Sequence, residues 1–437
     1  MAVYYKIYNY TLDLIENQFN EGDKLPGARR IAELFSCSLP KVQAVLDSLE
    51  QSGVVEGRER SGTYVSKGYG CQILPNNISC PRFADSLTES QQKKLQKLFP
   101  FLHLSKKFIT GGIEIAPSLD IQIRQQHFLN LNDIFEECYP DYRSRFHLQA
   151  LEPFKKDGRL YAIPLVFSPH LLWYNPELFE KYNIPLPRQD WTGNDFFAAM
   201  RQFKPFIPSK NIINYSPSFH QWMGFLHSSG GRIFGQQGEE AVLADSPETI
   251  AISKTYVKLL KEFNLDWDFN TWATPAFAEG KMAMYVGFKD NARNFKKLGI
   301  NFTPEAIYMP RLGGPVNYQG VMLIAFRKGC LNRENIKKML QFWLSEEIQE
   351  TLGRDDCGIP FLRSAAEKSL DPEKTPDSLF LKGLPCLCSD YNLNSEETGS
   401  VVLRASRLLN TGTPDDVEPF LRELATTLRF LMKLKNS

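Results

Sequence analysis

The chain has 437 residues, of which 43% are hydrophobic and 12% aromatic, and its formal net charge is +1. This length predicts two or three compact units, and the near-neutral charge points to neither a nucleic acid nor a membrane as partner of the whole molecule. No apolar run approaches the roughly 18 residues of a membrane span, and no basic segment precedes an apolar one at the N-terminus, so no signal peptide is predicted. Eight scattered cysteines without a C-x-x-C pair indicate reduced thiols, no metal site and a cytoplasmic protein.

The first 65 residues predict three helices followed by a two-stranded hairpin. An amphipathic helix over about residues 7–19 ends near Gly22, because glycine is a natural helix stop. A short second helix is followed by Ser38, a good N-cap for a third helix. That third helix buries apolar residues at i, i+3, i+4 and i+7 spacing, namely Val42, Val45, Leu46 and Leu49. Two β-rich runs, 54–55 and 63–65, flank an arginine-bearing tip, which completes the element order of a winged helix-turn-helix.

Four motifs of this module share the register of one family. They are Leu25-Pro26-x-x-Arg29, Ile31-Ala32, the stretch 38–50 and the stretch 61–65. Over about residues 4–66 the module resembles the GntR family of bacterial transcription regulators. The resemblance implies binding to a double-stranded DNA operator, and two half-sites predict a homodimer. The predicted DNA contacts are Arg29, Arg30, Ser38, Lys41, Gln43, Arg58, Arg60 and Gly62.

Some positions depart from the family. Leu39, Gln43 and Ala44 stand where members usually carry arginine, and Arg60 replaces the wing-tip glycine. Gln43 suits adenine, whereas the missing arginines disfavour guanine readout. Residues 1–67 hold eight Lys/Arg and nine Asp/Glu, a net charge of −1, although DNA-binding domains are usually basic. A winged helix that only contacts other proteins is therefore the alternative.

After the hairpin, residues 67–75 read as a linker that is short enough for lobe orientation to set the spacing of two winged helices. Strands are predicted near 77–83, 102–109 and 118–123, with a helix at about 88–99 between the first two. Strands that alternate with helices predict a parallel α/β sheet.

Five further motifs occur in order over about residues 75–430. They are the stretches 157–164, 172–179, 229–234, 277–285 and 357–360. Together they resemble the sugar- and peptide-type solute-binding proteins of ABC transporters. The resemblance implies two α/β lobes joined by a hinge, with a small molecule bound in the cleft. The whole chain is then an α+β multidomain protein, with a winged helix at 1–66, a linker at 67–75 and a two-lobed sensor at 76–437.

Aromatic side chains suit the apolar faces of sugars, and carboxylates suit their hydroxyls. The predicted ligand contacts are Asp120, Trp173, Trp222, Phe225, Trp272 and Phe288. Trp222 is the strongest aromatic candidate, and Phe288 matches a strand end that the family brings to its ligand. Ordinary core packing is the alternative for each aromatic residue, and helix capping is the alternative for Asp120.

No G-x-S-x-G, G-x-x-x-x-G-K-[ST] or G-x-G-x-x-G motif occurs, so neither an enzyme nor a bound cofactor is expected. The hypothesis is a cytoplasmic, sugar- or oligosaccharide-responsive transcription regulator. Two alternatives stay open: an aminotransferase-like domain that binds pyridoxal phosphate, and a solute-binding-like domain that has lost its ligand and serves oligomerisation. A C-terminal amphipathic helix over 414–433 is expected to pack on a lobe, with a dimer contact as its alternative.

Overall fold

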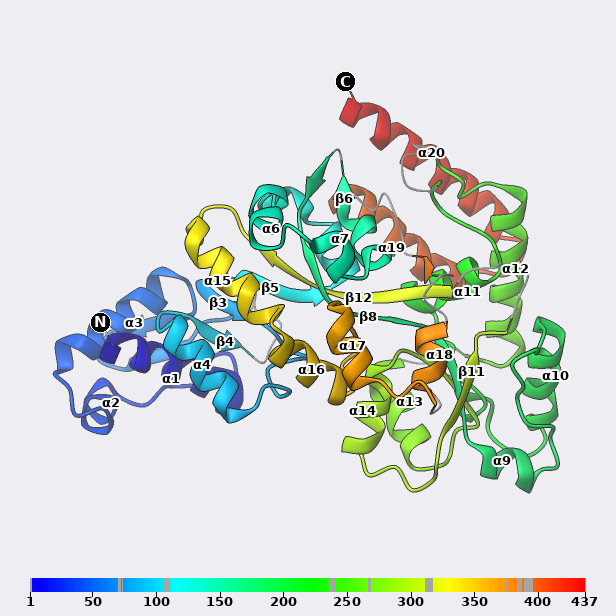
Figure 1. The fold of residues 1–437 in the computed structure, drawn as a ribbon, viewed down its shortest axis with the longest axis horizontal. Coiled ribbons are helices and arrows are strands. Elements are labelled where there is room, and N and C mark those ends of the chain that lie inside the picture. The colour runs from blue at the N-terminus through cyan, green and yellow to red at the C-terminus, as the bar shows by residue number, and fades with distance from the viewer. Residues whose placement is uncertain are drawn as a thin grey trace.

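The computed structural model describes residues 2–69, 72, 74–105, 111–156, 158–235, 241–265, 269–310, 317–373, 376–382, 387–388 and 396–436. The N-terminal module lies at one end of the molecule, and the remaining chain forms two lobes, each built around its own sheet (Figure 1). Across these described residues, no helix combines the length and apolarity needed to cross a membrane.

The N-terminal module is the predicted winged helix-turn-helix. Its elements are α1 (Ala2–Gln18), α2 (Ala28–Leu34), α3 (Leu39–Gln51), β1 (Val55–Arg58) and β2 (Gly62–Val65). The two strands pair antiparallel, with Val55 opposite Val65, and Lys24 forms a bridge to Tyr64 on the outer side of β2. All four apolar residues predicted to be buried by the third helix are buried in this module's core.

Lobe one is built on a mixed seven-stranded sheet. Its strands are β3 (Leu74–Ser79), β4 (His103–Ser105), β5 (Gly111–Pro117), β8 (Ile163–Pro169), β12 (Asn317–Phe326), β13 (Ile359–Pro360) and β14 (Leu387–Cys388). Strand β3 runs parallel to β4 and β5, but β12 is antiparallel to β5 and β8. The predicted parallel sheet is therefore wrong around β12, because this strand, which follows the lobe-two part of the chain, lies between β5 and β8 and runs opposite to both.

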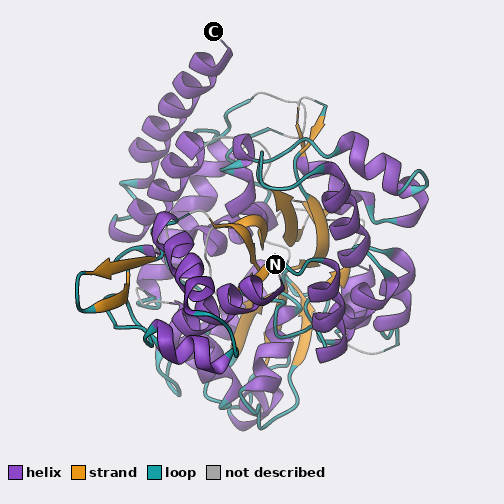
Figure 2. Ribbon diagram, turned by 90° about the vertical axis from the view of Figure 1, so that its left-hand side faces the viewer, coloured by secondary structure: helices purple, strands orange, loops and turns teal. Residues whose placement is uncertain are grey.

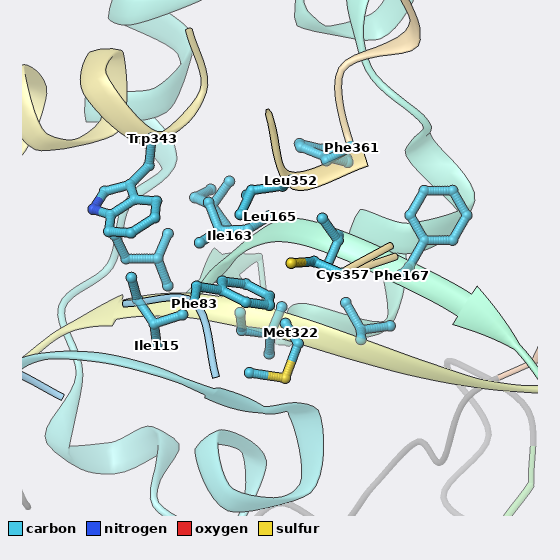
Figure 3. Packing of buried hydrophobic residues seen from close by; sticks show 14 of the residues in the cluster. Phe83, Ile115, Ile163, Leu165, Phe167, Met322, Trp343, Leu352, Cys357 and Phe361 are labelled. Atoms are coloured by element: carbon cyan, nitrogen blue, oxygen red, sulfur yellow. The ribbon is translucent and has the colours of Figure 1, made fainter. Parts of the chain in front are cut away.

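Helices cover this sheet and enclose a large apolar core, part of which is drawn in Figure 3. The helices of lobe one include α4 (Glu89–Leu98), α5 (Ser118–Gln122), α6 (Asn132–Cys138), α7 (Tyr142–Arg145), α8 (Leu148–Leu151), α15 (Arg333–Trp343), α16 (Glu346–Arg354) and α17 (Arg363–Ser369). The predicted helix at 88–99 is confirmed as α4, and Thr88 caps it in a reciprocal capping box with Gln91.

The predicted strand over 118–123 is wrong, because these residues form the short helix α5. The buried strand is the preceding one, β5, which ends at Pro117. Leu119 and Ile121 are both buried, and such a short alternating apolar run is compatible with either structure. The strand predicted over 102–109 is observed as β4 and ends at Ser105, while residues 106–109 lie outside the described residues.

Lobe two is built on the antiparallel sheet β10 (Met284–Gly287), β9 (Leu171–Tyr174) and β11 (Glu305–Tyr308). Both faces are buried: Leu172 and Tyr174 face one apolar cluster, while Leu171 and Trp173 face the other. One face packs on α13 (Phe269–Ala278) and α14 (Asp290–Lys297). The other face belongs to an apolar cluster that also includes residues of α9 (Pro176–Lys181), α10 (Gly193–Phe203), α11 (Phe219–Ser228) and α12 (Pro247–Glu262). Helices α19 (Glu396–Thr411) and α20 (Val417–Asn436) join this cluster by packing on α11 and α12.

The C-terminal helix α20 packs on lobe two, as expected from its apolar stripe. Val417, Leu421, Leu424 and Leu428 are all buried in the lobe-two core. The packing interpretation is therefore confirmed for these four residues.

The winged helix contacts lobe one directly. Tyr69 and Leu74, which lie within the predicted linker 67–75, are both buried in the winged-helix core. Asn9 Nδ2 of α1 donates a hydrogen bond to the carbonyl of Leu102 in lobe one at 3.0 Å. Figure 2 looks onto this end, where the N-terminal helices lie in front of lobe one. The winged helix is thus seated on the lobe and not held at a distance by a free spacer.

Candidate functional site

A cavity of about 940 Å³ lies between the two lobes. Lobe one contributes the segment 81–85, the end of β8 and residues 320–322 of β12. Lobe two contributes residues 216–221, the end of β10 and one side of α14. The cavity adjoins the crossing from β8 to β9, where His170 alone separates the strand of one lobe from the strand of the other.

Phe288 provides an apolar wall of this cavity. Its ring centroid is 4.0 Å from that of His170. A Cβ at Gly320 of β12 would lie 2.8 Å from the Phe288 ring, so that position needs glycine for the ring to approach. Burial, and secondarily the nearby His220, lowers the pKa of His170 to about 3, so this imidazole is neutral at physiological pH.

Two buried oxygens beside the cavity have no hydrogen-bond partner among the residues that the structure describes. They are Ser216 Oγ and Gln221 Oε1, and both residues line the cavity. Buried polar atoms are nearly always paired, so two oxygens without a partner beside a cavity are candidates for binding water or a ligand. The lining also carries the hydroxyls of Ser118, Ser168, Ser218, Thr274 and Tyr285 and the amides of Asn291 and Asn294.

Ion pairs tie α14 of lobe two to lobe one at the edge of the cavity. Arg82 Nη1 lies 2.9 Å from Asp290 Oδ2, and Arg293 Nε lies 2.7 Å from Asp355 Oδ2. The ammonium of Lys289 is 2.7 Å from carboxylate oxygens of both Asp356 and Asp377. The lining charges of Arg82, Asp290 and Arg293 are therefore each matched by an opposite charge within the protein.

Of the six predicted ligand contacts, Phe288 lines the cavity. Trp222 lies in the lobe-two core, where its Nε1 donates to Ser253 Oγ at 3.1 Å. Phe225 packs in the same core against Tyr256, at a ring-centroid distance of 5.1 Å. Trp173 packs against Phe295 on the opposite face of β9. These placements favour the core-packing alternative for Trp222, Phe225 and Trp173, and their contact with a ligand stays a prediction.

Asp120 and Trp272 do not line the cavity either. Asp120 lies in the first turn of α5, two residues after the cavity-lining Ser118, and burial raises the pKa of its carboxyl despite the opposing effect of Arg124. Trp272 is half-buried on α13, with Lys210 Nζ 4.0 Å from its ring centroid. A ligand contact by either residue stays a prediction.

Gln221 is not among the predicted ligand contacts, although it is adjacent to Trp222. Consecutive residues of an α-helix point about 100° apart, so α11 turns His220 and Gln221 toward the cavity and Trp222 into the core. A more polar stripe on one side of α11 was the available signal. The side of α11 that lines the cavity carries polar residues, whereas its aromatic residues Trp222 and Phe225 lie in the lobe-two core.

The eight predicted DNA contacts are all exposed on the winged helix. Ser38 occupies the N-cap position of α3 as predicted, but its side chain makes no capping hydrogen bond. Gln43 Nε2 donates to Asp47 Oδ1 at 2.8 Å. Arg58 pairs with Glu56 and lies over the ring of Tyr64, 4.0 Å from its centroid. Their contact with DNA is compatible with this exposure and stays a prediction.

Arg60 at the tip of the hairpin has a φ of +56°. This left-handed backbone conformation favours glycine, which explains why the family places glycine there. Arg60 therefore has a strained backbone, and its guanidinium lies at the tip of the wing.

A histidine that the sequence analysis did not select lies where the winged helix meets lobe one. His103 of β4 is 2% exposed, and its Nδ1 is 2.8 Å from Asn77 Oδ1. Its Nε2 is 3.1 Å from Asp13 Oδ1, and its Nδ1 is 3.7 Å from Glu16 Oε1, both on α1. This polar cluster, together with Asn9, connects α1 to the edge strand of the lobe-one sheet.

Two family models match the chain. The one described as "Bacterial extracellular solute-binding protein" matches residues 115–380, and the one described as "Bacterial regulatory proteins, gntR family" matches residues 6–65. These are solute-binding and regulatory families and not enzyme families. Both predicted resemblances are confirmed.

Among curated proteins, the chain is similar to the maltodextrin-binding protein MdxE of Bacillus subtilis (strain 168). The two are 23% identical over 273 residues, which cover 57% of this chain and 60% of that protein. The match thus spans somewhat less than two thirds of the relative's length.

Among solved structures, the chain is similar to the ABC substrate-binding protein Lmo0181 from Listeria monocytogenes in complex with cycloalternan. The identity is 14%, the TM-score is 0.69, and the match covers 83% of this chain and 99% of that one. UgpB from Mycobacterium tuberculosis in complex with glycerophosphocholine is 15% identical, with a TM-score of 0.67 and the same coverage of 83% and 99%. At these identities the likeness establishes the two-lobed fold and nothing further.

Proposed function

Because the chain belongs to the bacterial extracellular solute-binding protein family and carries a gntR-family regulatory domain at residues 6–65, we propose that it is a ligand-controlled transcription regulator. In this proposal residues 1–66 bind an operator, residues 76–437 bind the ligand, and residues 67–75 connect them. The protein acts on DNA in the bacterial cytoplasm as a homodimer, because paired half-sites are read by two winged helices.

The proposed ligand is a sugar or oligosaccharide held in the interlobe cavity. The observation that carries this proposal is the pair of unpartnered buried oxygens at Ser216 and Gln221, on a cavity that also offers the Phe288 ring. A sugar presents hydroxyl donors to such oxygens and an apolar face to such a ring. The near balance of charges at the edge of the cavity, where Arg82 faces Asp290, favours a neutral ligand over an anionic one.

Ligand binding is proposed to reach the DNA through strand β3. The strand begins at Leu74, inside the winged-helix core, and the residues that follow its end, Arg82 and Phe83, line the cavity. At the same edge of the sheet, α1 contacts lobe one through Asn9, which bonds to Leu102, and through Asp13, which lies beside His103. This path replaces the free linker as the coupling route, since a ligand shifts DNA affinity only if the two states of the sensor contact the winged helix differently.

The test is a thermal-shift titration of the full-length protein with maltotriose, with glycerophosphocholine, a zwitterion that is not a sugar, as the contrasting probe. A ligand that binds only the native state raises the midpoint by mass action, by the equivalent of about 2.7 kcal/mol at a hundredfold excess over Kd. We expect a shift with maltotriose or another neutral oligosaccharide and none with glycerophosphocholine. If no neutral mono- or oligosaccharide shifts the midpoint, the proposed ligand class is wrong, and a sensor that has lost its ligand becomes the better account.

A further inference from the structure

An exposed leucine stands at the first position of the helix that is expected to enter the DNA major groove. Leu39 opens α3 and is 43% exposed, and it is not among the residues packed on the winged-helix core. The other large apolar residues of α3 are buried, so Leu39 is not needed to hold the helix in place. Leu39 is therefore free to make a contact outside the fold of the module.

The surroundings of Leu39 are those of a DNA-reading surface. Ser38, whose hydroxyl makes no capping bond, immediately precedes it, and Lys41 is exposed two residues later. In helix-turn-helix proteins the N-terminal residues of this helix contact base edges. The first turn of α3 therefore presents an apolar group to the bases and a cation for the nearby phosphates.

The thymine C5-methyl is the apolar group that the major groove displays. Gln43 lies one turn after Leu39, on the same side of α3, and exposed Ala44 follows it. Asp47 accepts a hydrogen bond from Gln43 Nε2, which holds the Gln43 amide in one orientation. The remaining amide N–H and the carbonyl oxygen of Gln43 match adenine N7 and N6, so both side chains favour A·T pairs.

We propose that Leu39 is a specificity-determining residue that selects thymine through its C5-methyl group. The inference rests on the proposed function, since it needs a DNA operator. It deepens that function by naming the base that the start of α3 reads. Asp47 is a positioning residue in this account, because it acts through Gln43.

The experiment begins by selecting duplexes from a random library with the full-length protein. Each thymine of the selected site is then replaced by deoxyuridine, which lacks only the methyl group. We expect one replacement per half-site to weaken binding by about fourfold, the equivalent of one buried methyl group. The same replacement should leave the affinity of Leu39→Ala unchanged, so the two losses are not additive.

Leu34→Ala is the matched control, because Leu34 is an exposed leucine at the end of α2, outside α3. It should keep the full deoxyuridine penalty. The inference is overturned if every deoxyuridine duplex binds the wild-type protein normally, or if Leu39→Ala keeps the penalty. If no duplex is enriched at all, the proposed DNA function is wrong, and the inference about Leu39 is wrong with it. If duplexes are enriched but their binding does not depend on a thymine methyl group, only the inference about Leu39 is wrong.

Discussion

The reading surface of the winged helix and the cavity between the lobes place polar side chains in opposite environments. On the winged helix, Arg29, Lys41 and Gln43 project into solvent from one local module, and each is exposed without help from the rest of the chain. In the cavity, Ser216 and Gln221 are buried beside groups that lie more than a hundred residues away in sequence. A polar group on the surface costs little stability when its partner is missing, because water takes the partner's place. A buried polar group without a partner costs the full penalty of its desolvation. Variants of the two regions should therefore fail in different ways.

The largest effect is expected from Trp222→Ala. This side chain is 1% exposed in the lobe-two core, so its removal should lower the free energy of unfolding of the unliganded protein by roughly 3–5 kcal/mol. Chemical denaturation without ligand measures this loss. Trp222→Phe, which keeps most of the apolar volume, should lose much less. If Trp222→Ala unfolds at the wild-type midpoint but no longer binds the ligand, Trp222 is a ligand contact and not a core residue.

Gln221→Met should have the reverse pattern. It removes the unpartnered oxygen while keeping a side chain of similar shape, so the unliganded protein should keep its stability or gain slightly. If the oxygen binds a ligand hydroxyl, affinity for the responsive oligosaccharide should fall by about tenfold, the equivalent of a hydrogen bond worth roughly 1.4 kcal/mol. Calorimetric titration of both proteins measures the difference. Equal affinities would place the ligand elsewhere in the cavity.

Arg29→Ala should change DNA binding without changing the sensor. One lost phosphate contact should weaken binding to all sequences several-fold and reduce the slope of log K against log salt by about one. Fluorescence anisotropy at a series of salt concentrations measures the slope. Arg188→Ala is the control, since Arg188 is an exposed arginine on lobe two whose partner is Asp190. An unchanged slope for Arg29→Ala would remove this residue from the interface.

The smallest effect is expected at Arg60, where stability and binding should move in opposite directions. Arg60→Gly should relieve the positive φ and stabilise the winged helix by about 1 kcal/mol, while DNA affinity falls. Arg60→Ala should lose the same affinity but keep the strain. Thermal unfolding and DNA titration of both variants separate the two contributions. If both variants bind DNA as well as the wild type, the guanidinium makes no contact with it.

Much of the winged helix could be predicted from sequence because its signals are local. The spacing of Val42, Val45 and Leu49 determines which face of α3 is buried, and the remaining positions are therefore exposed. The cap position of Ser38 and the place of the hairpin follow from neighbouring residues. The order of motifs along the chain also identified the two-lobed fold, since each motif is continuous in sequence.

The cavity could not be predicted in the same way. In a pair such as Gln221-Trp222, the sequence allows either the polar or the aromatic side chain to face the cavity. The packing of α11 on lobe two decided that Trp222 points into the core and Gln221 lines the cavity. The local run over 118–123 was equally ambiguous, and the end of β5 at Pro117 decided that it is a helix. Nothing within 67–75 indicates that the winged helix is seated on lobe one, because that contact depends on α1 meeting His103 and Leu102.

The sequence by itself determined the order of the helices and strands within the winged helix, the two families and the exposed cations of the winged helix, since each depends on residues close together in the chain. Only the tertiary structure decided which side chains surround the cavity and how the winged helix meets lobe one. The physical reason is that Arg82, Ser216, Phe288 and Gly320 lie on separate elements and share one cavity only after both sheets have formed. No local pattern in the sequence records that the buried oxygen of Ser216 lies beside this cavity.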